Sequence, residues 1–407
     1  MNSLAKKFFV FLVILVFITM FTASYKTLNL DNIAILVSMA VDRSDNNRYQ
    51  VTFQFTNASS VSETGTTEKA PSIVNTIDAS SLSSAINLMN AYIGKELTLS
   101  HCKLIVFSEE IAKQGIQDEI YTLMNDSQIR PSTNIVISKC TAKSYIQNSK
   151  PILEPLITKY YEVFSNSSQF TGYTVNATIG DFFNDMLCET CQPFAILGGV
   201  NSEPQQTNTT IDSQKDSTIK SNESPVSGSL RSENIGLAVF KDGTLVGELN
   251  AIETLSFLSI RNDVEGFLVT VPNPDVENAY LDLYLTPAKD TQITVDLVNG
   301  SPYVKVNYSF KGRIYSMKEG AKYLQDDVLS AVSNYCSSYL ESTFSAYLYR
   351  TAKEFGTDIN GIGKHALRNF FTMPDFDTYN WNENYRNCFF DVHVDTNIKS
   401  RSLLTET

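Results

Sequence analysis

The chain has 407 residues, of which 43% are hydrophobic and 19% charged, with a formal net charge of −12 and a pI near 4.8. That length exceeds what one hydrophobic core usually organises, so two or three domains are expected, and the composition is that of a folded protein. An acidic chain without a basic stripe repels phosphates, which argues against nucleic-acid binding.

The N-terminal residues have the pattern of an export segment. Two lysines at positions 6–7 precede a largely apolar run over residues 8–23. A cationic start before an apolar core is typical of a signal or signal-anchor, which we place at residues 1–24. A buried N-terminal helix is the alternative, although such helices usually have a polar face. Because positive residues stay in the cytoplasm, the chain after Tyr25 is expected outside the membrane.

The region after this segment has the pattern of a β-hairpin. Residues 33–41 form a continuous apolar run, residues 42–47 are a polar turn, and residues 49–55 alternate apolar and polar side chains. These patterns predict two paired strands. Residues 57–79 are rich in Ser, Thr and Glu, and we expect them to form an outward loop.

Helices and strands then alternate. Residues 82–93 have apolar side chains at three- and four-residue spacing behind a Ser N-cap at position 80 or 81. A second capped helix is predicted over residues 108–123, between short apolar strands at 103–107 and 134–138. Strand, helix and strand in this order indicate an N-terminal mixed-sheet α/β region.

The composition changes sharply over residues 201–228, which are polar with few branched aliphatic side chains. Such a segment cannot bury enough surface to offset its chain entropy, so it is predicted to be a flexible linker. The predicted domains are therefore residues 25–200, possibly in two subdomains, and residues 229–400.

The second half begins with a strong hairpin pattern, in which two strands at 235–240 and 244–249 flank an Asp-Gly turn. A long helix is predicted over residues 318–355, followed by a returning strand at 388–394. Further strands are predicted at 267–271, 280–285, 291–297 and 303–310. This half is expected to be an α+β domain with antiparallel strands and one long helix.

Motifs that carry catalytic chemistry do not occur in the chain: there is no G-x-S-x-G elbow, Walker loop or H-E-x-x-H. Residues 361–364 resemble part of a phosphate loop, but the spacing is wrong and a Gly-permitted bend is the simpler interpretation. The adjacent carboxylates at 109–110 and 326–327 diverge by roughly 100° on a helix, so they are expected to be solvated. We predict no catalytic residue and no cofactor.

Histidine and cysteine residues give no stronger candidate. His101 and Cys102 are neighbours that would point to opposite faces of an extended strand. His365 and His393 are expected to be structural or surface residues. The lone Trp381 is expected to be a packing anchor.

Cys188 and Cys191 form a single C-x-x-C pair. A structural zinc site normally needs four ligands at recognisable spacing, so no metal site is predicted. In an exported chain the pair is either a structural disulfide or two buried thiols, and the sequence leaves both possibilities open.

Several short stretches together resemble the Ger(x)C family, the C subunits of spore germinant receptors, across nearly the whole chain. Each is weak alone, but their order and spacing are fairly specific. The stretches are 24–34, 99–107, 109–116, 128–131, 236–243, 245–249, 253–254, 358–363 and Trp381.

The resemblance implies a non-enzymatic, exported subunit needed for nutrient-triggered spore germination. It implies a location on the outer face of the spore inner membrane, and partnership with integral-membrane A-type and B-type receptor subunits. The family's lipidated cysteine position is occupied here by Ser24. A hydroxyl cannot form the thioether of a lipoprotein, so no lipidation is expected.

Two other classes of protein are compatible with an exported body. One is an extracytoplasmic solute-binding or envelope-interaction protein, which as a solute binder should show two lobes of repeated βαβ units. The other is a secreted hydrolase, which is disfavoured because no nucleophile–base or metal set appears.

Overall fold

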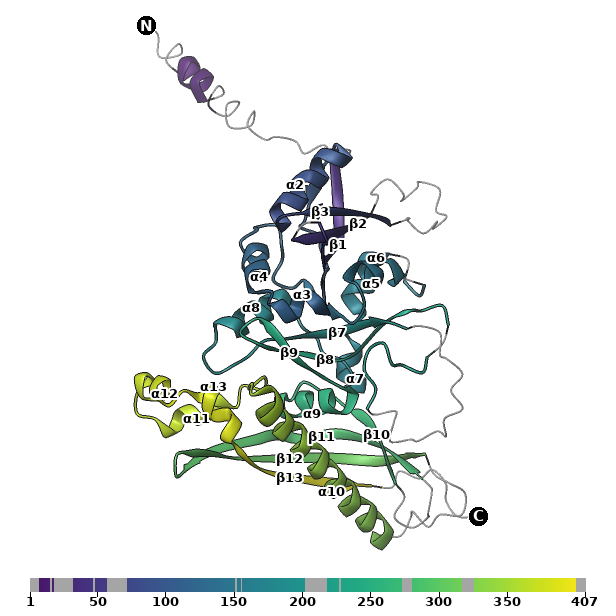
Figure 1. Cartoon of the computed structure of the whole chain (residues 1–407), viewed down its shortest axis with the longest axis vertical. Helices are drawn as coiled ribbons and strands as arrows, with labels where there is room; N and C mark the ends of the chain where they lie inside the picture. The colour runs from purple at the N-terminus through teal and green to yellow at the C-terminus, as the bar shows by residue number, and fades with distance from the viewer. Residues whose placement is uncertain are drawn as a thin grey trace.

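The chain folds into two β-sheets with helix α9 (Ala251–Arg261) lying between them, as Figure 1 shows. This computed structural model describes residues 7–14, 17, 32–46, 48–56, 72–150, 152–154, 156–201, 218–226, 228–272, 280–316 and 326–399. Residues 7–14 are helical. Within the described ranges, no helix combines the length and the apolar character needed to cross a membrane.

The first sheet has nine strands and is mixed. Along the sheet the order is β3 (Ile73–Ala79), β2 (Tyr49–Thr56), β1 (Ile33–Arg43), β5 (Leu104–Ser108), β6 (Asn134–Ser138), β7 (Phe194–Val200), β8 (Ser232–Lys241) and β9 (Thr244–Leu249), with β4 (Glu96–Thr98) beside β1. Strands β1, β5, β6 and β7 run parallel, and the hairpins at both ends are antiparallel. The predicted mixed-sheet α/β region is confirmed.

Seven helices accompany this sheet in the described part of the chain. They are α2 (Leu82–Ile93), α3 (Glu109–Gln114), α4 (Gln117–Met124), α5 (Ala142–Asn148), α6 (Ile157–Val163), α7 (Ser167–Thr171) and α8 (Ile179–Leu187). Helix α2 begins at the predicted N-cap, where the Ser81 hydroxyl accepts a hydrogen bond from the Ser84 amide. The helix predicted over 108–123 is instead two helices, because Gly115 adopts a φ of 102° and ends α3.

The expectation of an outward loop over residues 57–79 is wrong at its C-terminal end. Residues 73–79 form strand β3, which pairs along its whole length with β2. The Ser-, Thr- and Glu-rich composition of the preceding residues hid the apolar side chains of Ile73, Val74 and Ile77. Residues 57–71 lie outside the described residues.

The hairpin β8–β9 forms as predicted, with Asp242 and Gly243 both at positive φ as a type I′ turn requires. It belongs to the first sheet, because β8 pairs antiparallel with β7. The first sheet therefore continues past the predicted linker. Domains at 25–200 and 229–400 stay a prediction, and the boundary between them is not an edge of the sheet.

The predicted linker is also too long at its C-terminal end. Ser221 is buried, its hydroxyl donates to the Leu197 carbonyl at 2.8 Å, and the same oxygen accepts from the Ile235 amide at 2.7 Å. The Ile219 carbonyl accepts from the first amide of α9 at 3.0 Å. Polar side chains can thus fix a segment that has few apolar anchors. Residues 202–217 lie outside the described residues.

The second sheet has the order β10 (Phe267–Pro272), β11 (Tyr280–Val298), β12 (Ser301–Ser316) and β13 (Phe389–Ile398). The first three strands are antiparallel, and β13 returns parallel to β12. The strands predicted at 280–285 and 291–297 are one strand, β11, whose register shifts between Pro287 and Gln292. The predicted α+β arrangement is confirmed.

The long helix α10 (Asp326–Arg350) continues into a single π-helical turn, η3 (Thr351–Phe355), so the predicted helix end is confirmed. Residues 318–325 of the prediction lie outside the described residues. Short helical segments follow: α11 (Gly363–Ala366), η4 (Leu367–Asn369), α12 (Met373–Tyr379), α13 (Trp381–Asn384) and η5 (Tyr385–Asn387).

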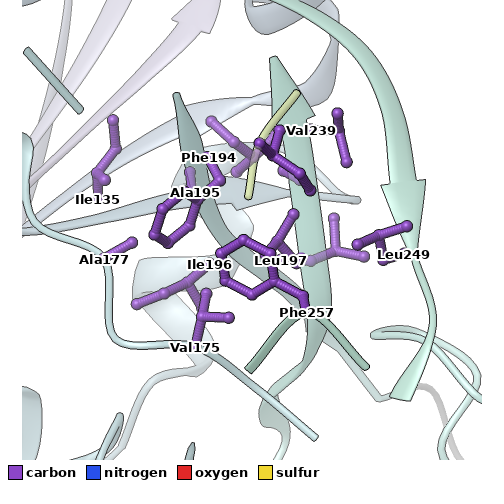
Figure 2. Close-up of a cluster of buried hydrophobic side chains, with 14 of the residues drawn as sticks. Ile135, Val175, Ala177, Phe194, Ala195, Ile196, Leu197, Val239, Leu249 and Phe257 are labelled. Atoms are coloured by element: carbon purple, nitrogen blue, oxygen red, sulfur yellow. The ribbon is translucent and has the colours of Figure 1, made fainter. Parts of the chain in front are cut away.

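Helix α9 connects the two sheets through its side chains. All of its residues except Glu253 and Arg261 are buried, as expected for a helix covered on every side. Its Phe257 ring packs edge-on against Phe194 of β7, with ring centroids 4.8 Å apart. Figure 2 shows this contact within a cluster that also contains Val175 and Leu197.

Helix α10 covers the outer edge of the second sheet. Four of its side chains accept hydrogen bonds from outward-facing amides of edge strand β13: Tyr349 from Phe390, Glu341 from Val394, Ser337 from Thr396 and Ser333 from Ile398, at 2.9–3.3 Å. Their four- and eight-residue spacing places them on one helix face. An edge that would otherwise pair with another chain is thereby satisfied internally.

Replacing Ser337 with Ala should expose the Thr396 amide and weaken this edge. We expect a loss of about 1–2 kcal/mol of local stability, seen as roughly 5–30-fold faster hydrogen exchange in a peptide covering β13. Ser338, which is exposed, provides the matched control: Ser338→Ala makes the same change in helix propensity without removing a contact. Equal hydrogen-exchange rates of the β13 peptide in the two variants would contradict the proposal that Ser337 covers the edge of β13.

Candidate functional site

The segment that follows η3 is organised by the carboxylate of Asp358, which is fully buried. Its Oδ1 accepts from the Ile362 amide at 3.1 Å, and its Oδ2 accepts from the Gly363 amide at 2.8 Å and from the Trp381 indole at 2.9 Å. Burial raises the pKa of this carboxyl, and the three N–H donors oppose that shift. Asp358 thus holds a loop closed against Trp381.

The same segment contacts the first sheet. The Thr357 hydroxyl donates to the Phe240 carbonyl of β8 at 3.1 Å. The Phe355 ring packs over Gly247 of β9 so closely that a Cβ at that position would overlap the ring. The end of the long helix is therefore fitted to the β8–β9 hairpin of the first sheet.

A third piece of chain closes this junction. Cys188 and Cys191 form a disulfide, and Thr190 between them lies against Gly363. A Cβ on Gly363 would lie 2.7 Å from Trp381 and 3.1 Å from the Thr190 Cβ, so glycine is needed for this close approach. The sequence left open whether this pair is a disulfide or two thiols, and the structure has the disulfide. Its loop packs against Gly363, beside the Asp358–Trp381 contact.

A groove of about 680 Å³ lies beside the junction, between α9 and α10. On one wall the Arg350 guanidinium donates from Nη1 to both oxygens of Glu253 at 2.6 Å, and from Nε to Glu354 at 3.0 Å. Glu253 also caps the N-terminus of α9 through the Asn250 amide. The groove is an open surface lined by the N-terminal end of α9, by α10 and by η3, and it carries these charged side chains on one wall.

The histidine and cysteine candidates are not brought together. Cys102 is buried, its thiol donates to the Leu104 carbonyl, and burial raises its pKa to about 12, so it stays protonated at neutral pH. Its neighbour His101 is exposed, and the two occupy a turn rather than the predicted extended strand.

His393 is paired with Glu341 at 2.9 Å. His365 lies in α11, where burial and two nearby cations lower its pKa.

Of the adjacent carboxylates that were expected to be solvated, Glu110 and Asp327 are exposed, whereas Glu109 is partly buried. Glu109 forms ion pairs with Lys113 and Lys139, and these two lysines lower its pKa despite partial burial. In the portion of the chain that the structure describes, no three His, Cys, Asp or Glu side chains gather as metal ligands. Ser24 lies outside that portion.

Sequence reasoning missed the role of Asp358. The residues of the family signature at 358–363 and Trp381 are separate in the sequence, and hydrophobic periodicity does not link them. Their joint presence in the family pattern is the one signal that could have indicated a contact. The structure explains the pattern: the glycines permit the loop, and Asp358 and Trp381 close it.

Comparisons with known proteins give two family models that match successive parts of the chain. The model of the spore germination protein N-terminal domain matches residues 26–197, and that of the spore germination B3/GerAC-like C-terminal domain matches residues 235–402. Spore germination protein KC of Bacillus subtilis (strain 168) is 22% identical over 386 residues, covering 92% of this chain and 91% of that protein. The crystal structure of the GerBC protein aligns with 88% of this chain and 96% of its own, at 17% identity and a TM-score of 0.49.

Replacing Asp358 with Asn should loosen the junction. An amide removes the cost of a buried charge but, in either orientation, turns an NH₂ group toward at least one N–H donor. We expect a loss of about 1–3 kcal/mol. Trp381 is the only tryptophan, so its fluorescence reports directly on this site during urea unfolding.

The matched control is Asp377→Asn, which changes an exposed carboxylate on α12. Its unfolding midpoint should stay at the wild-type value, whereas that of Asp358→Asn should fall. If the Trp381 fluorescence of both variants had the same urea midpoint, the Asp358 contact would not stabilise the junction.

Proposed function

This chain belongs to the Ger(x)C family of spore germination proteins, and we propose that it is the C subunit of a spore nutrient germinant receptor. The observation that carries the proposal is that both domain models of the family match, in order, on the two halves of one chain. The relative from Bacillus subtilis also aligns over nearly the full length of both proteins.

The proposed role is non-enzymatic assembly of the receptor. The Cys102 thiol is buried and protonated, and the buried Asp358 carboxylate accepts hydrogen bonds from three N–H donors. The positions that match the family pattern after the long helix build the contact between the two halves. A subunit of this kind acts by presenting a fixed surface to its partners.

The proposed partners are integral-membrane A-type and B-type receptor subunits, with the folded body on the outer face of the spore inner membrane. Support comes from the cationic and apolar pattern of residues 1–24, which predicts an export segment with the body outside the membrane. The open groove between α9 and α10 is a surface available to such a partner.

Deleting the gene should slow nutrient-triggered germination while germination by agents that bypass receptors proceeds normally. The tagged protein extracted from dormant spore membranes should co-purify with multispanning receptor subunits. The measurements are the loss of optical density during germination and mass spectrometry of the purified complex. Normal nutrient germination in a strain without a related C subunit would refute the assignment.

We further propose that residues 1–24 are retained as an unlipidated membrane anchor. The apolar run is marginal for spanning a bilayer, but Ser24 and Tyr25 can extend it into the interface, where Tyr is favoured. The intact mass of the membrane-extracted protein should therefore correspond to a chain that retains these residues without an acyl group.

Two masses would count against the anchor. A chain beginning at Tyr25 would show cleavage by a signal peptidase. An added acyl mass at Ser24 would show that the hydroxyl is modified despite lacking the thiol that lipoprotein attachment uses.

A further inference from the structure

One end of the first sheet lies where the chain enters the folded body. Strand β1 starts at Ile33, which pairs with Glu96 of β4, and β4 is the element that follows helix α2. Strand β3 starts at Ile73 opposite Phe55, and Phe55 also pairs with Leu36 near the start of β1. The starts of β1, β3 and β4 and the C-terminal end of α2 therefore lie together. Figure 1 shows α2 at the end of the molecule opposite the second sheet.

Three large apolar side chains are exposed at this end, and we call them the anchor-side patch. Ile73 of β3 is 51% exposed, and Leu88 and Tyr92 of α2 are 45% and 75% exposed. Leu88 and Tyr92 are four residues apart, so they are neighbours on the helix surface. Single exposed apolar residues are ordinary on a protein surface, whereas a group of them indicates an interaction site.

Helix α2 is also uncharged in a protein that is otherwise acidic. Its sequence, LSSAINLMNAYI, contains no Asp, Glu, Lys or Arg, although the whole chain has a formal net charge of −12. Lys95 and Glu96, which follow the helix, are exposed and have opposite charges. The helix can therefore approach an apolar surface without the cost of removing charged side chains from water.

The length of chain before β1 limits which surface this end can meet. Residues 25–31 are seven residues, which span at most about 25 Å when fully extended. If residues 1–24 are the membrane anchor, as proposed above, the start of β1 lies within that distance of the bilayer interface. A tether this short holds the patch at an effective concentration of about a millimolar, so even a weak contact with the bilayer is populated.

We propose that the anchor-side patch rests on the lipid bilayer that holds the anchor, with the Tyr92 ring in the interface. Tyrosine is favoured at this depth because its ring is apolar while its hydroxyl stays hydrated. Lys95 can extend its ammonium group to lipid phosphates from the same end of the molecule. This placement rests on the proposed anchor, and it holds the second sheet at the end of the body away from the membrane.

The probe is a tryptophan at position 92, in the detergent-purified full chain reconstituted into phosphatidylcholine vesicles. In vesicles whose lipid is brominated on acyl carbons 6 and 7, Tyr92→Trp should lose about half of the emission that the new tryptophan adds, because an interfacial ring lies beside these carbons. The wild type contains only Trp381, which is buried at the junction, so its emission should be equal in both lipids. Phe371→Trp, a fully exposed control site between η4 and α12, should be unquenched.

A charge placed in the patch should lift α2 from the lipid. In the Tyr92→Trp background, Leu88→Glu should remove most of the quenching, because a carboxylate resists transfer out of water. Ser83→Glu, which adds the same charge at the N-terminal end of α2, should leave the quenching unchanged. Both positions are exposed, so neither change should unfold the helix.

Flotation of the vesicles distinguishes failure of this placement from failure of the anchor. A chain that does not float with the vesicles would refute the anchor and the placement together. A chain that floats, but whose tryptophan at position 92 is no more quenched than one at position 371, would refute the placement alone and leave the patch to a protein partner. Equal quenching in the Leu88→Glu and Ser83→Glu variants would also contradict it.

Discussion

A buried carboxylate needs hydrogen-bond donors, because it has lost its contacts with water. Asp358 accepts from three N–H donors, and their positions determine the path of the chain after the long helix. Two donors come from its own loop and one from Trp381, so the loop closes and the short helices that follow are drawn against it. Thr357 and Phe355, directly before the loop, are thereby placed on the β8–β9 hairpin. This closure adds to the contacts of α9 with β7 and of β8 with β7, which also join the two parts of the chain.

The long helix meets a different constraint. A helix that only packed on a sheet would be apolar on one face, but α10 must also satisfy the free amides of β13. Its Ser333, Ser337, Glu341 and Tyr349 side chains do so, beside a buried stripe that includes Val332, Leu340 and Phe344. The polar stripe dilutes the amphipathic pattern of the helix. It also satisfies the edge of β13, which would otherwise be open to pairing with other chains.

Local patterns predicted most of the individual elements. Alternation and apolar runs located β1, β2, β5, β6 and the Asp-Gly hairpin, because each depends on side chains close in sequence. The patterns did not show that the hairpin joins the first sheet, since pairing between β7 and β8 spans the polar residues after Val200. They also missed β3, where three apolar residues follow a polar stretch. The Asp358–Trp381 contact was out of reach for the same reason, because periodicity carries no information about partners that are distant in sequence.

The two ends of α9 are held by charge contacts of different kinds. At the N-terminal end, Glu253 caps the helix and accepts from Arg350 of α10 through both carboxylate oxygens, so the charges of both residues are satisfied. At the C-terminal end, Arg261 is favourably placed for the helix dipole, lies over the Phe194 and Phe257 rings and donates from Nε to Asp263. One end therefore secures α9 to α10, and the other secures it to β7 through Phe194. Because α9 lies between the two sheets, both ends add to the junction that Asp358 also closes.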